Sequence, residues 1–294
     1  MSRMPTSPQS RRQFMVTAAG SLAVARPTAA RQLTAEAVIE RIRANVGVPW
    51  RENTVDGLKA GDPATVVTGL AVTVMATLDV LRKAAGANRN FIVTQEPVFY
   101  AANDNPGTRE KDPVYLAKKE FIEKERLVIF RFVEHWNASR PQAAPMALAN
   151  ALGWGKERAA ESDRLYAVPP TTLAALAADV RTRLDIRGGV RVVGRPDLAI
   201  RSAYVSPGTT DVPGVLAHIA RADVVIAGEP REWEAVPYVA DSVTAGHAKG
   251  MIALGRIVSE EPGALVTAVW LKSLMPELAI DSIRLTDPYW SASA

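Results

Sequence analysis

The chain of 294 residues contains no cysteine. Disulfide bonds, thiolate metal sites and cysteine nucleophiles are therefore excluded, and an oxidising compartment is compatible with this composition. No apolar run approaches the ~20 residues that a membrane-spanning helix needs. Low-complexity tracts and short internal repeats are also missing. Apart from the N-terminal segment described below, we expect no contact with a membrane.

The chain has little net charge of its own once its N-terminus is set aside. It carries 35 basic and 31 acidic residues, for a formal net charge of +4. Residues 1–30 hold four arginines and no acidic residue, so they account for the whole surplus. Residues 31–294 therefore have a formal net charge of zero. We expect no nucleic-acid-binding surface, because such surfaces need a basic patch.

Residues 1–30 have the features of a twin-arginine signal peptide. Arg11 and Arg12 are followed, after one residue, by the apolar pair Phe14 and Met15. A short, mildly apolar stretch extends to residue 25, and small residues at 23–25 and 28–30 are suited to a signal peptidase. We predict export of the folded protein and a periplasmic or secreted location. The alternative is a basic N-terminus that carries the arginine pair by chance.

Beyond residue 31, β-branched or apolar segments alternate with segments of helical periodicity, which is typical of the α/β class. The expected strands are residues 66–77, 91–94, 127–133, 190–193, 199–205, 222–227, 249–254 and 279–285. The expected helices are residues 78–87, 113–126, 171–184, 212–220, 232–243 and 262–274. A polar stretch at 153–170 ends in two prolines and indicates a boundary. We therefore expect an N-terminal lobe at 31–155 and a C-terminal lobe at 156–294.

Polar and charged side chains follow four of the expected strands. In open α/β sheets, ligands bind beyond the carboxyl ends of the strands, so these side chains are candidates for a functional site. They are Gln95 and Glu96 after the second strand, His135 and Asn137 after the third, Glu229 after the sixth, and Arg256 and Glu260 after the seventh.

Four motifs resemble the signatures of the Nif-three-like family, whose bacterial members are often described as GTP cyclohydrolase 1 type 2 homologues. The motifs lie at residues 56–62, 92–100, 222–229 and 255–263, in the order expected for the family. The resemblance runs from about Leu33 to near the C-terminus. It implies two interlocked α/β lobes, toroidal hexamers, and a two-metal centre in the cavity between the lobes.

The chain departs from this family at the metal ligands that the resemblance implies. Gln95 and Glu96 stand where the family has two histidines, and Asn137 stands where it has an aspartate, although the adjacent His135 could substitute. Arg256 stands where the family has a histidine, while the final glutamate is retained as Glu260. A guanidinium keeps its proton and cannot bind a metal.

These departures predict that Arg256 pairs with Glu260, with Glu96 or with both, in the space of the metals. A two-metal centre is therefore not expected. Two alternatives stay open. In one, a single divalent ion (zinc, manganese or iron) is held by Glu96, Glu260 and either Gln95 or His135. In the other, no metal is bound. Glu96 and Glu260 could instead be ordinary surface carboxylates. The pattern favours His135 as a hydrogen-bonded or stacking residue over a ligand.

Two functional hypotheses follow. In the first, the exported protein uses the cavity between its lobes to bind a small molecule or to hydrolyse one. A metal-bound water would then attack the substrate, and Glu96 and Glu260 would hold the metal or act as the base. In the second, the protein is a non-catalytic binding or scaffold protein in which the pair of Arg256 with a glutamate has replaced the metals, with Glu229 nearby. Both hypotheses include a homo-oligomer, a hexamer by resemblance, and neither specifies the small molecule.

Overall fold

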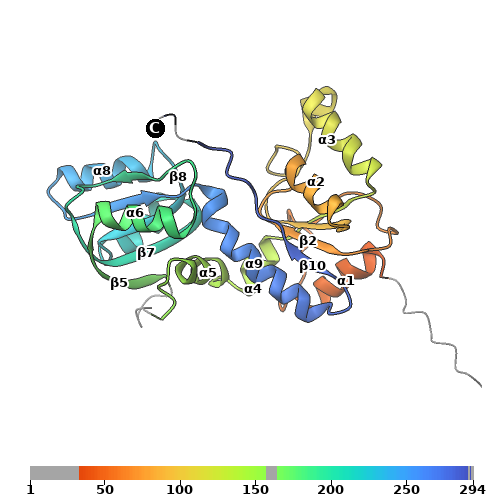
Figure 1. Cartoon of the computed structure of the whole chain (residues 1–294), viewed down its shortest axis with the longest axis horizontal. Coiled ribbons are helices and arrows are strands. Elements are labelled where there is room, and N and C mark those ends of the chain that lie inside the picture. Colours follow the sequence, from red (N-terminus) through yellow and green to blue (C-terminus); the bar gives the residue numbers. More distant parts are fainter. Residues whose placement is uncertain (1–32, 157–163, 291, 293–294) are drawn as a thin grey trace, which may run out of the picture. The chain divides into compact units, whose positions relative to one another are not determined.

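The computed structural model describes residues 33–156, 164–290 and 292. The chain divides into two units, residues 1–31 and residues 32–294, and all the described residues belong to the second unit (Figure 1). The predicted signal peptide lies outside the described residues. Two five-stranded sheets with helices on both faces make up the second unit. This arrangement confirms the predicted α/β class.

The first sheet has the strand order β1-β4-β3-β2-β10. Strands β4, β3, β2 and β10 are parallel to one another, and the edge strand β1 is antiparallel to β4. Every residue of β2, β3 and β4 is buried, as in parallel strands that are covered on both faces. The bounds are β1 Gly57–Ala60, β2 Leu70–Thr73, β3 Phe91–Thr94, β4 Val128–Arg131 and β10 Ile280–Ser282.

Alternate residues of these strands face two different cores. Val72, Val93 and Phe130 pack with α1 (Ala35–Asn45) and with part of α9 (Arg256–Leu274). Ala71, Ile92 and Ile129 pack on the opposite face with α2 (Leu78–Gly86) and α3 (Pro113–Lys124). The two-residue period of a strand thus places one helical layer on each side of the sheet.

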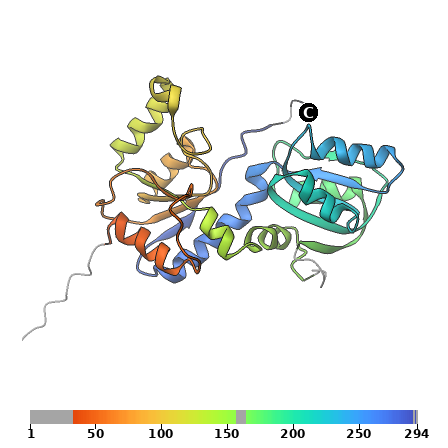
Figure 2. The same ribbon diagram turned by 180° about the vertical axis from the view of Figure 1, so that it is seen from behind.

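The second sheet has the order β5-β7-β8-β9-β6, with a parallel centre and antiparallel edge strands. Helices α5 and α6 cover one face, and α7 and α8 cover the other (Figure 2). The strand bounds are β5 Leu165–Thr172, β6 Arg191–Val193, β7 Ala199–Thr210, β8 Val224–Pro230 and β9 Gly250–Ala253. The helix bounds are α5 Ala143–Ala151, α6 Leu173–Arg183, α7 Val212–Ile219 and α8 Ala235–Thr244.

Helix α9 belongs to both cores. It starts at the carboxyl end of β9 and packs against strands of both sheets and against α5. Val258 near its start lies in the core of the second sheet, whereas Ala268 and Leu271 lie in that of the first. The sequence predicts that this helix starts at Pro262, but it starts six residues earlier, so that Pro262 lies inside it. A proline often marks a first helical turn, and this preference made the predicted start wrong.

Two features of the sheets bear on the expected division into lobes. Strand β10 lies within residues 156–294 and pairs with β2 of the first sheet. The polar stretch at 153–170 contains the start of a strand, because β5 begins at Leu165. Its two prolines are tolerated because β5 is an edge strand, and its pairing with β7 is irregular after Ala167.

Several short elements were not predicted from the sequence. They are α1, β1, the 3₁₀ helix at Gly107–Lys111, α4 (Glu134–Ser139) and α5. In the part of the chain that the structure describes, no helix is both long enough and apolar enough to cross a membrane.

Candidate functional site

The guanidinium of Arg256, in the first turn of α9, lies among three carboxylates. Its Nη2 donates to Oε1 of Glu96 at 2.7 Å. Its Nη1 donates to Oε2 of Glu229 at 3.0 Å and to Oγ1 of Thr209 at 2.7 Å. Its Nε lies 3.4 Å from Oε2 of Glu260, close enough for an ion pair. The predicted contact of Arg256 with Glu96 and Glu260 is therefore present.

The two sheets bring these five residues together at the ends of their strands. Glu96 lies two residues beyond β3 of the first sheet. Thr209 and Glu229 lie near the carboxyl ends of β7 and β8, and Arg256 follows β9 by three residues. Adjacent parallel strands place their carboxyl ends along one edge, which explains why residues so distant in sequence meet.

Glu260 is the carboxylate with the most unusual environment. Burial raises its pKa, the charge of Arg256 opposes this, and the negative charges of Glu96 and Glu229 raise it further, so that the pKa of Glu260 is about 7. Its Oε2 and the Nε of Arg256 are buried, and neither has a hydrogen-bond partner among the described residues. Near neutral pH both protonation states of this carboxyl group are therefore populated.

Arg256 stays charged under all ordinary conditions. Burial lowers its pKa, but Glu260 and Glu96 raise it electrostatically, and hydrogen bonds to Glu229 and Glu96 raise it again. The net result is a pKa above the usual value for arginine. A permanent cation therefore stands at the centre of the site, where it repels a divalent ion and cannot bind one.

Close backbone packing supports the first turn of α9. The Oγ of Ser259, a fully buried residue, accepts from the backbone N of Gly208 at 3.1 Å and donates to the carbonyl of Arg256 at 2.8 Å. Gly208 has φ +70°, and a Cβ atom there would lie 2.7 Å from Oε1 of Glu260. A Cβ at Gly228 would lie 2.4 Å from the carbonyl of Gly208. Only glycine allows the two segments to approach this closely.

His135 does not join this site. Its ring is buried, its Nδ1 lies 2.7 Å from Oδ2 of Asp56, and its Nε2 accepts from the backbone N of Arg51 at 2.9 Å. Since Nε2 accepts, Nδ1 carries the proton of the neutral ring. The ring also stacks on Trp50 with 3.8 Å between centroids. Both ring nitrogens of His135 are engaged in these contacts, so neither is free to bind a metal in this arrangement. It is the hydrogen-bonded and stacking residue that the sequence favoured.

The remaining predicted ligands are Asn137 and Gln95. Asn137 is exposed on α4, and Gln95 is buried with its backbone carbonyl accepting from Nε of Arg131 at 3.1 Å. No cluster of three or more histidine, aspartate or glutamate side chains within residues 33–156, 164–290 and 292 has an arrangement suited to a metal ion. The sequence analysis did not select Thr209, which lies near the carboxyl end of β7.

Two cavities lie elsewhere on the molecule. One, of about 900 Å³, is lined by residues of 61–68, 88–90 and 122–127. The other, of about 250 Å³, is lined mainly by apolar residues, among them Val74, Leu184, Val258 and Ile283. Neither is lined by Glu96 or Arg256, although the smaller one is lined by residues of both predicted lobes, such as Val74 and Leu184.

Two mixed β-sheets share helix α9, and strands of both sheets end at one charged cluster. This arrangement defines a two-sheet α/β protein. The family model Duf34/NIF3 (NGG1p interacting factor 3) matches residues 49–277, and the chain belongs to this family. The resemblance seen in the sequence motifs is thereby confirmed. A search of curated proteins gave no match.

Several solved structures share the fold. A Staphylococcus aureus hypothetical protein aligns with a TM-score of 0.68 and 17% identity over 88% of this chain and 99% of its own. A Bacillus cereus protein related to NIF3 aligns with a TM-score of 0.67 and 14% identity over 88% and 99%. Reduced HcgD from Methanocaldococcus jannaschii aligns with a TM-score of 0.58 and 16% identity over 86% and 99%. Identities this low show the fold alone.

Proposed function

We propose that this protein is a metal-independent member of its family, a binding protein whose site is organised by Arg256 in place of a dinuclear metal centre. The observation that carries the proposal is the position of the guanidinium, which bonds Glu96 at 2.7 Å and lies 3.4 Å from Glu260. These are the two carboxylates that the sequence offered as metal ligands. The guanidinium satisfies their charge, and its own charge disfavours a divalent ion beside them.

The proposal is tested by the metal content of the purified protein and of the variant Arg256→His. We expect less than one equivalent of zinc, manganese or iron per native chain. The histidine variant removes the fixed charge and adds a ligand beside Glu96 and Glu260, so its zinc affinity, measured by calorimetry, should rise at least tenfold. The matched control Arg256→Lys keeps the charge and should not gain affinity. Two equivalents of tightly bound metal in the native protein would overturn the proposal.

A second candidate function, a hydrolase, is favoured by Glu260. A carboxyl group with a pKa of about 7 is suited to proton transfer at neutral pH, because both of its protonation states are populated. A reaction that uses Glu260 as base would rise with pH through about 7 and would be lost in Glu260→Gln. Glu96 would then orient Arg256, and one divalent ion could take part only if Arg256 moved away. If the rate of every hydrolysis tested stays constant through pH 7, the hydrolase candidate is rejected and the binding role is retained.

We further propose that the protein is exported by the twin-arginine route and works in the periplasm or outside the cell, as a homo-oligomer that binds a small molecule. The arginine pair at 11–12 supports the route, and the zero formal net charge of residues 31–294 supports self-association. Light scattering on residues 31–294 tests the assembly, and a monomer at micromolar concentration contradicts it.

A further inference from the structure

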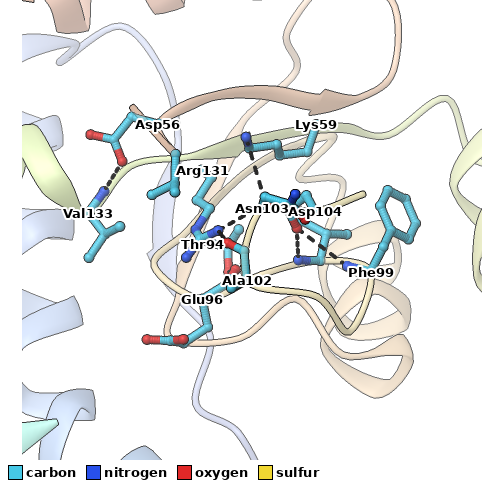
Figure 3. Close-up of polar contacts among 12 residues, drawn as sticks. Asp56, Lys59, Thr94, Glu96, Phe99, Ala102, Asn103, Asp104, Arg131 and Val133 are labelled. Atoms are coloured by element: carbon cyan, nitrogen blue, oxygen red, sulfur yellow. Dashed lines mark hydrogen bonds and ion pairs between the residues drawn. The ribbon is translucent and has the colours of Figure 1, made fainter. Parts of the chain in front are cut away.

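The segment that carries Glu96 is held by an unusual group of buried charges. Residues 95–104 follow β3, and three basic side chains from different elements approach this segment. Lys59 from β1 and Arg131 from β4 are seen in Figure 3, and the third is Lys118 from α3. Asp104 lies with them and is the acidic member of the group. Lys118, Arg131 and Asp104 are 2%, 7% and 9% exposed, so their charges must be paired within the protein.

Arg131 joins the two ends of this segment. Its Nε donates to the carbonyl of Gln95 at 3.1 Å, next to Glu96. Its Nη1 donates to the carbonyl of Ala102 at 2.6 Å and to Oδ2 of Asp104 at 3.1 Å. One planar guanidinium therefore fixes the start and the end of the segment relative to each other. A lysine could not do this, because it lacks the rigid array of donors.

Asp104, the last residue of the segment, also binds the middle of the segment. Its Oδ1 accepts from the backbone N atoms of Val98 at 2.5 Å and Phe99 at 3.4 Å, and its Oδ2 lies 3.7 Å from Nζ of Lys59. The carbonyl of Val98 accepts from Nζ of Lys118 at 2.6 Å. Burial lowers the pKa of Lys118 to about 8, against the attraction of Asp104. Asp104 is the one carboxylate in a group with three cations, so the pairing of charge within this group depends on Asp104.

The position of Glu96 follows from these contacts. Its backbone N donates to the carbonyl of Val74 at 2.9 Å, and its own carbonyl accepts from Oγ1 of Thr94 at 3.3 Å. The preceding carbonyl, that of Gln95, is bound by Arg131. The backbone on both sides of the Glu96 Cα is thereby fixed, and its side chain extends to Nη2 of Arg256.

We propose that Asp104 is a positioning residue for the Arg256 site, acting through Arg131 and the segment 95–104 to hold Glu96 against Arg256. This inference rests on the proposed function, in which Glu96 and Arg256 form the centre of the site. Asp104 itself makes its contacts with the segment, with Arg131 and with Lys59. Its influence therefore reaches Glu260 through the placement of Glu96.

The test follows the titration of Glu260 by NMR of protein with ¹³C-labelled glutamate. Glu96→Gln removes a negative neighbour, so the pKa of Glu260 should fall by about one pH unit from about 7. Asp104→Asn leaves Glu96 charged but releases it from Arg256, and should lower the pKa in the same direction. The double variant should show no further fall, because both changes act through the same contact.

Two more variants separate positioning from a general loss of stability. Arg131→Lys keeps the charge but cannot hold both ends of the segment, and it should reproduce the effect of Asp104→Asn. Thr77→Ala removes the N-cap of α2 in the same lobe, where Oγ1 of Thr77 accepts from Val80 N, and should leave the Glu260 titration unchanged. An unchanged pKa in both Asp104→Asn and Arg131→Lys would overturn the inference. The readout involves no metal, so its failure is distinct from a failure of the proposed function.

Discussion

The carboxyl group of Glu260 makes the stability of the protein depend on pH. Its pKa is raised from the ordinary 4.5 to about 7 in the folded state. Between these values the folded protein holds a proton that the unfolded chain has released, so stability falls as pH rises through this window. A shift of this size corresponds to about 3 kcal/mol, all of it lost above pH ~7.

We predict that Glu260→Gln, which cannot ionise, removes this dependence. Urea unfolding of both proteins at pH 5, 6, 7 and 8 measures it. The native protein should lose about 2.5 kcal/mol more than the variant between pH 5 and pH 8. Parallel pH profiles for the two proteins would show that the Glu260 carboxyl group has an ordinary pKa.

At the scale of single residues, part of the site could be predicted from the sequence. Glu96, Glu229, Arg256 and Glu260 were recognised because they follow buried strands, and the rule for strand ends needs no knowledge of sheet order. The role of His135 was less accessible. It depends on Asp56 and Arg51, which lie some 80 residues earlier and meet the ring only in the folded chain.

Helix starts illustrate how far local signals extend. Helices α2 and α3 begin where predicted, because Thr77 and Asp112 accept hydrogen bonds from the first-turn backbone N–H groups. The start of α9 was misplaced because Gly255 has no side chain to cap it, and φ +90° at this glycine becomes visible only in the structure. The partner of β10 was also beyond local signals, since β2 lies about 200 residues earlier.

The cap of α3 gives a prediction for a single element. Oδ1 of Asp112 accepts from the backbone N of Val114 at 2.9 Å and of Tyr115 at 3.1 Å. Asp112→Ala leaves these donors without their acceptor and should lower the free energy of unfolding by about 1 kcal/mol. Asp112→Asn keeps an acceptor oxygen and should lose only a few tenths. Equal losses in the two variants, measured by urea unfolding, would contradict a capping role.

For the whole molecule, export is the property that the sequence predicts most directly. Arg11 and Arg12 provide the pair that the twin-arginine receptor reads. Replacing both by lysine keeps the charge but should leave the precursor in the cytoplasm, as cell fractionation would show. A single change, Arg3→Lys, lies outside the pair and should have no effect. Efficient export of the double-lysine protein would mean that residues 1–30 are not a signal of this type.

The pairing of β10 with β2 sets the order of events during synthesis. Residues 280–282 form an edge strand of the first sheet, whose other four strands end by residue 131. A ribosome that has made the N-terminal strands must therefore complete almost the entire chain before this sheet can close. Folding can finish only after translation has finished.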